Sequence, residues 1–185
     1  MKIYNAGHML TRGAQFQRQV EKDELNSVAS DLEWYDPKEN KEINDKVNLD
    51  NNDGLAEKIV RQDTNALFWA DTVVIEPLPE ALGTHVELGQ LKGMRDMATA
   101  IVHIINNANS VDDAFMRIGA LCDKQINRAV YPHYEDIRRF KGANESEDRR
   151  SWGINQYVYG VCLDLTEGKG LYDWGEVLKE LSNEE

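Results

Sequence analysis

The chain contains little cysteine and no long apolar run, and both absences bear on where it works. Cys122 and Cys162 are the only cysteines among 185 residues. They have neither CxxC spacing nor the density of a secreted disulfide scaffold, so we expect two free thiols in a reducing compartment. The longest apolar stretch, Ala98 to Ile105, includes a threonine and a histidine and is too short to span a bilayer. Because the N-terminus also becomes polar too early for a signal peptide, we expect a soluble, cytoplasmic protein.

Positive charge is scarce as well. The sequence has 21 Lys and Arg against 33 Asp and Glu, which gives a formal net charge of -12. Nucleic acids are bound largely through Lys and Arg on phosphates, so we expect neither DNA nor RNA as a partner. A small neutral ligand suffers no such repulsion. The length of 185 residues suits a single domain with its own core, over residues 1–185.

Motifs for common cofactors are missing too. The chain has no G-x-G-x-x-G and no G-x-x-x-x-G-K-[ST], which argues against a dinucleotide or a P-loop nucleotide. No His, Cys and Asp residues have metal-ligand spacing. We therefore expect neither a cofactor nor a metal.

Short apolar segments alternate with amphipathic ones, a pattern typical of an α/β fold. Helical spacing is clearest over residues 55–67, where an apolar residue or Asp63 recurs at every fourth position. We predict a flavodoxin-like or Rossmann-like three-layer sandwich with a five-stranded, mostly parallel sheet and its ligand at the carboxyl ends of the strands. Residues 106–153 are expected to form a helical insertion before the last strand. The expected strands are residues 2–6, 32–36, 72–78, 98–105 and 155–163, and further helices are expected over 16–28, from 83 onward and over 174–181.

Two carboxyl groups stand where catalytic groups would be useful. Asp63 lies on the apolar stripe of its predicted helix, so it should point inward, where desolvation raises the pKa of a carboxyl group and suits it to donate a proton. Glu87 lies in the first turn of the helix expected from Gly83, where the helix dipole would keep it ionised as a nucleophile. Cleavage of a glycosidic bond requires such a pair, one nucleophile and one acid.

Both residues also have plainer explanations. Thr84 and Glu87 have the [ST]-x-x-E spacing of a capping box, in which the glutamate only reaches back to the N-cap amide. Asp63 could face solvent or bond to a nearby amide. Spacing alone does not choose between these interpretations.

Four short motifs, in this order, resemble those of nucleoside 2-deoxyribosyltransferases. The resemblance covers the predicted sheet and its loops and is thinnest over residues 106–153. The motifs are Ile3-Tyr4-Asn5-Ala6-Gly7, Asp63-Thr64-Asn65-Ala66-Leu67-Phe68-Trp69-Ala70-Asp71, Gly83-Thr84-His85-Val86-Glu87-Leu88-Gly89 and Ile154-Asn155-Gln156-Tyr157.

The resemblance implies a role for each matching residue. Glu87 would be the nucleophile that forms a 2-deoxyribosyl-enzyme, with the Tyr4 hydroxyl orienting its carboxylate. Asp63 would contact the base and help to protonate it. Asn155 would bind the sugar in the site of a neighbouring subunit, which implies a homo-oligomer with shared sites. The other residues expected to bind substrate lie in loops: Gly7, His8 and Gly83.

The chain also departs from the family pattern. Six residues before Glu87, where the family often has a second base-binding aspartate, it has Ala81, with Glu80 beside it as a substitute. We expect transfer of 2-deoxyribose between nucleobases. The alternatives are hydrolysis of deoxynucleosides or 5′-nucleotides, and a non-catalytic nucleotide-binding module.

Overall fold

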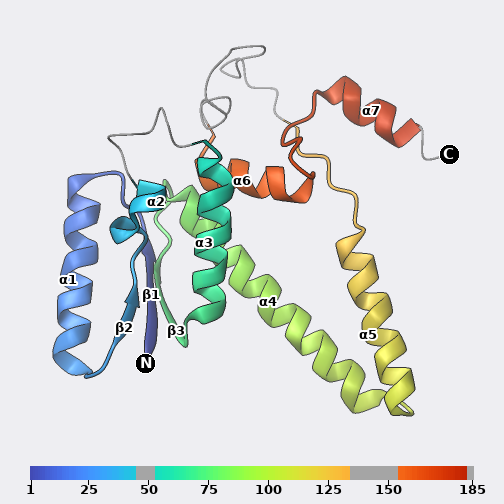
Figure 1. Ribbon diagram of the computed structural model, residues 1–185, viewed down its shortest axis with the longest axis horizontal. Helices are drawn as coiled ribbons and strands as arrows, with labels where there is room; N and C mark the ends of the chain where they lie inside the picture. Colours follow the sequence, from blue (N-terminus) through green and yellow to red (C-terminus); the bar gives the residue numbers. More distant parts are fainter. Residues whose placement is uncertain (45–52, 134–153, 183–185) are drawn as a thin grey trace. The chain divides into compact units, whose positions relative to one another are not determined.

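The computed structural model describes residues 1–44, 53–133 and 154–182. The chain divides into two units, one formed by Met1–Leu88 together with Tyr131–Glu185 and the other by Gly89–Val130. The first unit contains the sheet, and the second is helical (Figure 1).

A parallel three-stranded sheet in the order β2-β1-β3 forms the centre of the first unit. The middle strand, β1 (Lys2–Gly7), pairs with β2 (Glu33–Tyr35) on one side and with β3 (Thr72–Glu76) on the other. Tyr4 lies level with Tyr35 in this register and is fully buried. Because all three strands run the same way, their carboxyl ends meet at one edge of the sheet.

Helices lie on both sides of the strands. Figure 1 shows α1 (Arg12–Val28) on one side and α3 (Leu55–Trp69) on the other. Successive side chains of a strand point to opposite faces, and β1 follows this rule. The Asn5 amide donates to the backbone carbonyl of Arg18 in α1 at 3.4 Å. Tyr4 instead faces α3, where the charge of the Asp63 carboxylate raises the pKa of its hydroxyl.

A buried arginine fixes α1 to the sheet. Arg18 is 1% exposed, and its guanidinium donates to the carbonyl of Ala6 at 3.0 Å and to the carboxylate of Glu76 at 2.5 Å. A Cβ at Gly7 would come within 2.1 Å of this guanidinium, so only glycine leaves room for it. Phe16 of the same helix is 70% exposed. The one fully buried residue of α1 is therefore a charged one.

The helix α6 (Gln156–Leu165) packs against α3. Gly160 allows the close approach, because a Cβ there would lie 2.4 Å from the carbonyl oxygen of Ala56. Asn155 begins the helix, and its side chain accepts two backbone hydrogen bonds, at 2.9 and 3.3 Å, from the first turn. The contact of α3 and α6 contributes much of the core, whose buried apolar residues are Ile3, Tyr4, Ala6, Leu55, Ala56, Val60, Ala66, Leu67, Ala81, Tyr157, Tyr159, Leu163, Tyr172 and Val177.

The predicted flavodoxin-like or Rossmann-like five-stranded sheet is wrong, because two of its strands are helical. Residues 98–105 lie inside α4 (Leu82–Asn107). Residues 155–163 consist of the N-cap Asn155 and most of α6. A short apolar run fits a buried strand or a buried helix equally well. No glycine or proline between 94 and 107 interrupts the helix that begins at Leu82, and Asn155 is a strong N-cap.

The remaining elements are short or lie in the second unit. A 3-10 turn, η1 (Pro37–Glu39), and α2 (Lys41–Asn44) follow β2, and α7 (Trp174–Ser182) is the last helix. The second unit contains most of α4 and all of α5 (Val111–Ile126). Within the helical insertion expected over residues 106–153, residues 127–133 form no helix, and residues 134–153 lie outside the described residues. No helix in the described ranges is both long and apolar enough to cross a membrane.

Candidate active site

A hydrogen bond between two buried side chains lies at the centre of the candidate site. The Tyr4 hydroxyl, on the middle strand, donates to Oε1 of Glu87 in α4. Tyr4 is fully buried and Glu87 is only 5% exposed. The capping-box interpretation of Glu87 is wrong, because α4 begins at Leu82 and Thr84 therefore lies inside the helix instead of at its N-cap.

Asp63 is held in the same manner by a second tyrosine. Its Oδ1 accepts a hydrogen bond of 2.8 Å from the Tyr35 hydroxyl, and the residue is 4% exposed, which confirms the inward orientation that the apolar stripe predicts. The rings of Tyr4 and Tyr35 are in contact, with centroids 5.3 Å apart. Burial and the neighbouring carboxylates raise the pKa of both tyrosines above the usual range, so both stay protonated as donors.

Burial raises the pKa of both carboxyl groups. Desolvation raises the pKa of Glu87 to about 8, the hydrogen bond from Tyr4 opposes this, and the charge of Asp63 adds to it. Desolvation raises the pKa of Asp63 to about 6, against the hydrogen bond from Tyr35. The pair therefore holds one proton between about pH 6 and pH 8. The expectation that the helix dipole keeps Glu87 ionised is wrong, because Glu87 lies beyond the first turn from Leu82 and desolvation dominates.

A pocket of about 460 Å³ opens beside this pair, within the first unit. Asp63 lines the pocket directly. Tyr4 and Glu87 do not line it but lie just behind its wall, since Gly83 and Thr84, one turn before Glu87, are lining residues. Such a volume suits a small organic molecule. The four residues expected to bind substrate all line the pocket: Gly7, His8, Gly83 and Asn155.

Asn155 reaches the pocket of its own chain. Its Oδ1 would lie 3.6 Å from a Cβ placed on Gly83, so the start of α6 and the start of α4 are neighbours. The same oxygen caps α6, and the cap therefore fixes the side chain at the pocket. A second subunit is not needed to bring Asn155 to this site. The family resemblance predicts sites shared between subunits, whereas this position of Asn155 predicts a site built within one chain.

Acidic side chains outnumber basic ones in the described lining of the pocket. Glu80 and Ala81 both line it, so the glutamate beside the missing aspartate does face the ligand space. With Asp63 it gives the pocket two acidic side chains, and His8 is the one basic side chain among the described lining residues. No Lys or Arg of the described chain lines it. This lining disfavours an anionic ligand.

Sequence reasoning missed Tyr35 and the apolar wall. Tyr35 carried no signal beyond its place at the end of the second predicted strand, because its partner Asp63 lies 28 residues away. Part of the wall could have been found, since Leu55 and Ile59 share the stripe that predicted the direction of Asp63. The apolar lining residues are Met9, Leu10, Pro37, Ile43, Leu55, Ile59, Ala81, Leu82, Ile154 and Tyr157.

Comparisons of the chain with protein-family models, with curated proteins and with solved structures found no match. Among the residues that the structure describes, no three His, Cys, Asp or Glu side chains gather as a metal site would require. Function must therefore be argued from the geometry and chemistry of the pocket and the buried pair.

Proposed function

We propose that the chain transfers 2-deoxyribose between nucleobases through a covalent intermediate on Glu87. The observation that carries this proposal is the pair of buried carboxyl groups, each bonded to a tyrosine hydroxyl, which holds one proton near neutral pH. Retaining cleavage of a glycosidic bond uses one carboxylate as nucleophile and one carboxylic acid as proton donor. Glu87 and Asp63 supply these two groups.

In the first half-reaction the proton of the pair resides on Asp63 and Glu87 is ionised. This is the minor arrangement of the singly protonated pair, because the pKa of Glu87, about 8, lies above the pKa of Asp63, about 6. A carboxylate oxygen of Glu87 bonds to C1′ of the nucleoside while the C1′–N bond breaks, and its electron pair leaves with the base. Asp63 gives its proton to the departing base. The Tyr4 hydroxyl stabilises the Glu87 carboxylate before the attack, since it already donates to that group. Gly83 lines the pocket four residues before Glu87 in the same helix.

The second half-reaction reverses these steps with a new base. A nitrogen of the incoming base bonds to C1′, the bond to Glu87 breaks, and Asp63 takes back a proton from the base. Two inversions give net retention at C1′. If water replaces the second base, the same site hydrolyses the nucleoside, so hydrolysis is the alternative outcome.

The lining favours a nucleoside over a 5′-nucleotide as substrate. Glu80 and the singly protonated pair of Asp63 and Glu87 give the pocket negative charge, and no described lining residue is Lys or Arg. A phosphate would be repelled there without a paired cation, whereas an uncharged sugar would not. The two free cysteines agree with a cytoplasmic setting for this reaction.

Incubation of the protein with deoxyinosine and free adenine, followed by chromatography of the products, tests the proposal. We expect deoxyadenosine and hypoxanthine, and we expect Glu87→Ala to lose at least a thousandfold in rate. Hypoxanthine with free deoxyribose would instead indicate a hydrolase. No product at all would indicate a non-catalytic binding module.

A trapped intermediate distinguishes covalent catalysis from direct displacement. A 2′-fluorinated deoxynucleoside forms glycosyl esters that break down slowly, so we expect it to add the mass of one sugar to the peptide that contains Glu87. Glu87→Gln serves as the matched control and should gain no mass. An unmodified wild-type peptide under conditions of turnover would contradict the proposed role of Glu87.

A further inference from the structure

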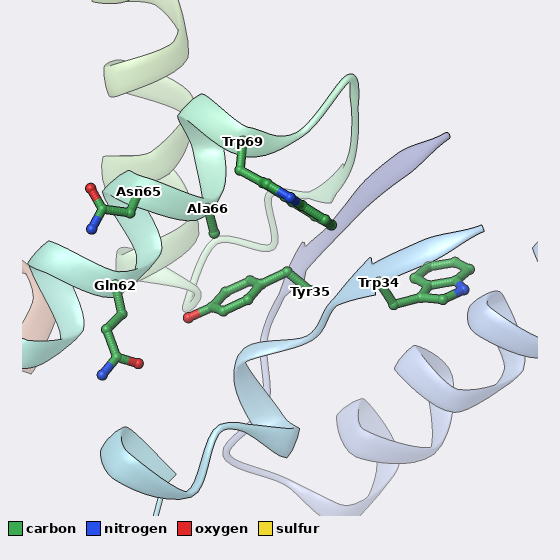
Figure 2. A pocket seen from close by; sticks show the side chains of 6 residues that line it. All are labelled: Trp34, Tyr35, Gln62, Asn65, Ala66 and Trp69. Atoms are coloured by element: carbon green, nitrogen blue, oxygen red, sulfur yellow. The ribbon is translucent and has the colours of Figure 1, made fainter. Parts of the chain in front are cut away.

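A second pocket, separate from the candidate active site, lies in the first unit. It has a volume of about 320 Å³ and is formed by β2 and α3. Figure 2 shows the side chains that surround it, and we call them the aromatic slot. They are Trp34, Tyr35, Gln62, Asn65, Ala66 and Trp69.

The helix α3 turns an unusual face toward this slot. Gln62, Asn65, Ala66 and Trp69 follow i, i+3, i+4 and i+7 spacing, so they form one stripe of the helix. Asp63 lies on a different face. A stripe that packs tightly against a strand is usually rich in large aliphatic residues, but this one combines two amides, one small residue and one tryptophan. The small side chain of Ala66 leaves the hollow between the rings unfilled.

The aromatic rings of the slot are held from behind. In Figure 2 the Trp69 ring lies on one side of the hollow and the Tyr35 ring on the other, with Ala66 between them. The Tyr35 hydroxyl is fixed by its 2.8 Å hydrogen bond to Asp63, and the ammonium of Lys2 lies 5.5 Å from the centre of the Trp69 ring. Rings that are already in place lose little freedom when a ligand binds between them.

Trp34 closes one end of the slot, opposite to the amides in Figure 2, and its indole donates to Asn26 at 3.0 Å. At the other end, Gln62 is engaged, because its amide donates to Glu42 and accepts from Asn40. Asn65 differs, since its amide makes no hydrogen bond to any residue that the structure describes. Its NH2 group and its carbonyl oxygen therefore offer both donor and acceptor contacts to a ligand.

We propose that the aromatic slot binds a nucleobase, as a second site distinct from the catalytic pocket. Stacking of a planar heteroaromatic ring on tryptophan and tyrosine is favourable for every base, and an asparagine amide can pair with the donor and acceptor edge of such a ring. Trp69 and Tyr35 supply the stacking surfaces, and Asn65 supplies the edge contact. The choice of a nucleobase over other planar heteroaromatic molecules rests on the proposed function.

Equilibrium dialysis with radiolabelled adenine tests the slot. We expect two adenine molecules per wild-type chain, one in the catalytic pocket and one in the slot. Trp69→Leu and Asn65→Leu should each weaken the binding of one adenine molecule at least tenfold and leave the affinity for the other unchanged. Trp174→Leu is the control, because it makes the same change at a tryptophan that lies in α7 and outside the slot, and it should keep the binding of both adenine molecules.

Circular dichroism establishes that each variant is folded, and the exposed position of Asn65 makes its variant the safer of the two. The slot proposal is overturned if both slot variants bind adenine with the stoichiometry and affinity of the wild type. Its failure is distinguishable from failure of the proposed function. If the protein transfers 2-deoxyribose but binds no adenine in the slot, only the proposed function stands. If it binds adenine in the slot but shows no turnover, only the slot proposal stands.

Discussion

Glu87 and Asp63 are carboxyl groups that the fold buries although their charged forms would be more stable in water. Each is 5% exposed or less, and each has one tyrosine hydroxyl as a hydrogen-bond donor. Desolvation outweighs these hydrogen bonds, because the pKa of each group stays above its ordinary value. Strongly shifted groups beside a pocket are typical of catalytic sites, and they oppose stability at the pH where they work.

The first prediction is that Glu87→Gln inactivates the protein and stabilises it at alkaline pH. The folded-state pKa of about 8 lies above the ordinary value of 4.5, so stability is present below pH 4.5 and is lost as the pH rises toward 8. The loss is about 1.4 kcal/mol per pH unit in that window. Glutamine does not ionise and removes this loss.

Thermal unfolding of both proteins at pH 5 and pH 8 measures the effect. The midpoint of the variant should exceed that of the wild type by several degrees more at pH 8 than at pH 5. Equal differences at the two pH values would mean that Glu87 is not buried as a protonated group.

The second prediction concerns the pH dependence of kcat/KM. The active form has one proton on the pair, so the rate should fall below about pH 6, where both groups are protonated, and above about pH 8, where both are ionised. The two limbs belong to the coupled pair and not to single residues. Measurement of transfer between pH 5 and pH 9 should give a bell-shaped profile.

Asp63→Asn is the control for this profile. It removes the acid, so the alkaline limb should disappear and the residual rate should only rise with pH. It also removes a charge that raises the pKa of Glu87, so the remaining limb should lie below the wild-type pKa of about 8 for that group if ionisation of Glu87 controls it. A variant that retains a bell would show that Asp63 is not one of the two groups.

At the scale of elements, a few contacts decide where the pocket forms. The close packing of α3 and α6 at Gly160 brings the start of α6 to the pocket, and the N-cap holds Asn155 there. On the other side of β1, the Arg18 guanidinium fills the space that a side chain at Gly7 would need. Both glycines are therefore required by neighbouring atoms and not by a turn.

The third prediction separates the two roles of Asn155, the cap of α6 and a contact for the sugar. Serine is also a good N-cap, whereas alanine is not, so only Asn155→Ala should lower stability, by about 1 kcal/mol. Both variants lose the amide that faces the pocket. We therefore expect KM for deoxyinosine to rise at least tenfold in both, while the unfolding midpoint falls in Asn155→Ala alone. Wild-type kinetics in Asn155→Ser would show that Asn155 only caps α6 and does not contact the sugar.

At the scale of the whole molecule, the first unit holds every residue assigned to the reaction. Tyr4, Asp63, Glu87 and Asn155 all fall in Met1–Leu88 or after Tyr131. The second unit has a different character, since α5 buries none of its side chains. A helix without buried contacts gains little beyond its intrinsic propensity, so the chemistry is expected to depend on the first unit.

The fourth prediction follows from the completeness of this unit. Mixing Glu87→Ala chains with Asn155→Ala chains, under conditions in which subunits exchange, should restore no activity, because each chain is expected to build its site from its own residues. Asn155→Ala must first be shown to be severely impaired alone. Recovery of wild-type sites in the mixture would support the shared site that the family resemblance implies, and it would contradict assembly of the pocket within one chain.

The sequence by itself determined the local features of this protein. Apolar residues at four-residue spacing predicted α3 and the inward orientation of Asp63. The short apolar segments at residues 2–6 and 72–78 predicted β1 and β3. These features depend on neighbours a few residues apart, so a pattern in the sequence records them. The four motifs also named residues that the fold brings to one pocket or to its wall, including Gly7 and Gly83.

Only the tertiary structure decided the rest. The apolar run over 98–105 has no local signal that separates strand from helix, and it is a helix because nothing interrupts α4. The tyrosine partners of Glu87 and Asp63 lie 83 and 28 residues away, so neither these hydrogen bonds nor the degree of desolvation could be deduced from spacing. The pKa of Glu87 shows the consequence. A helix dipole predicted from sequence would favour the ionised form, but burial, which only the packed structure sets, favours the proton.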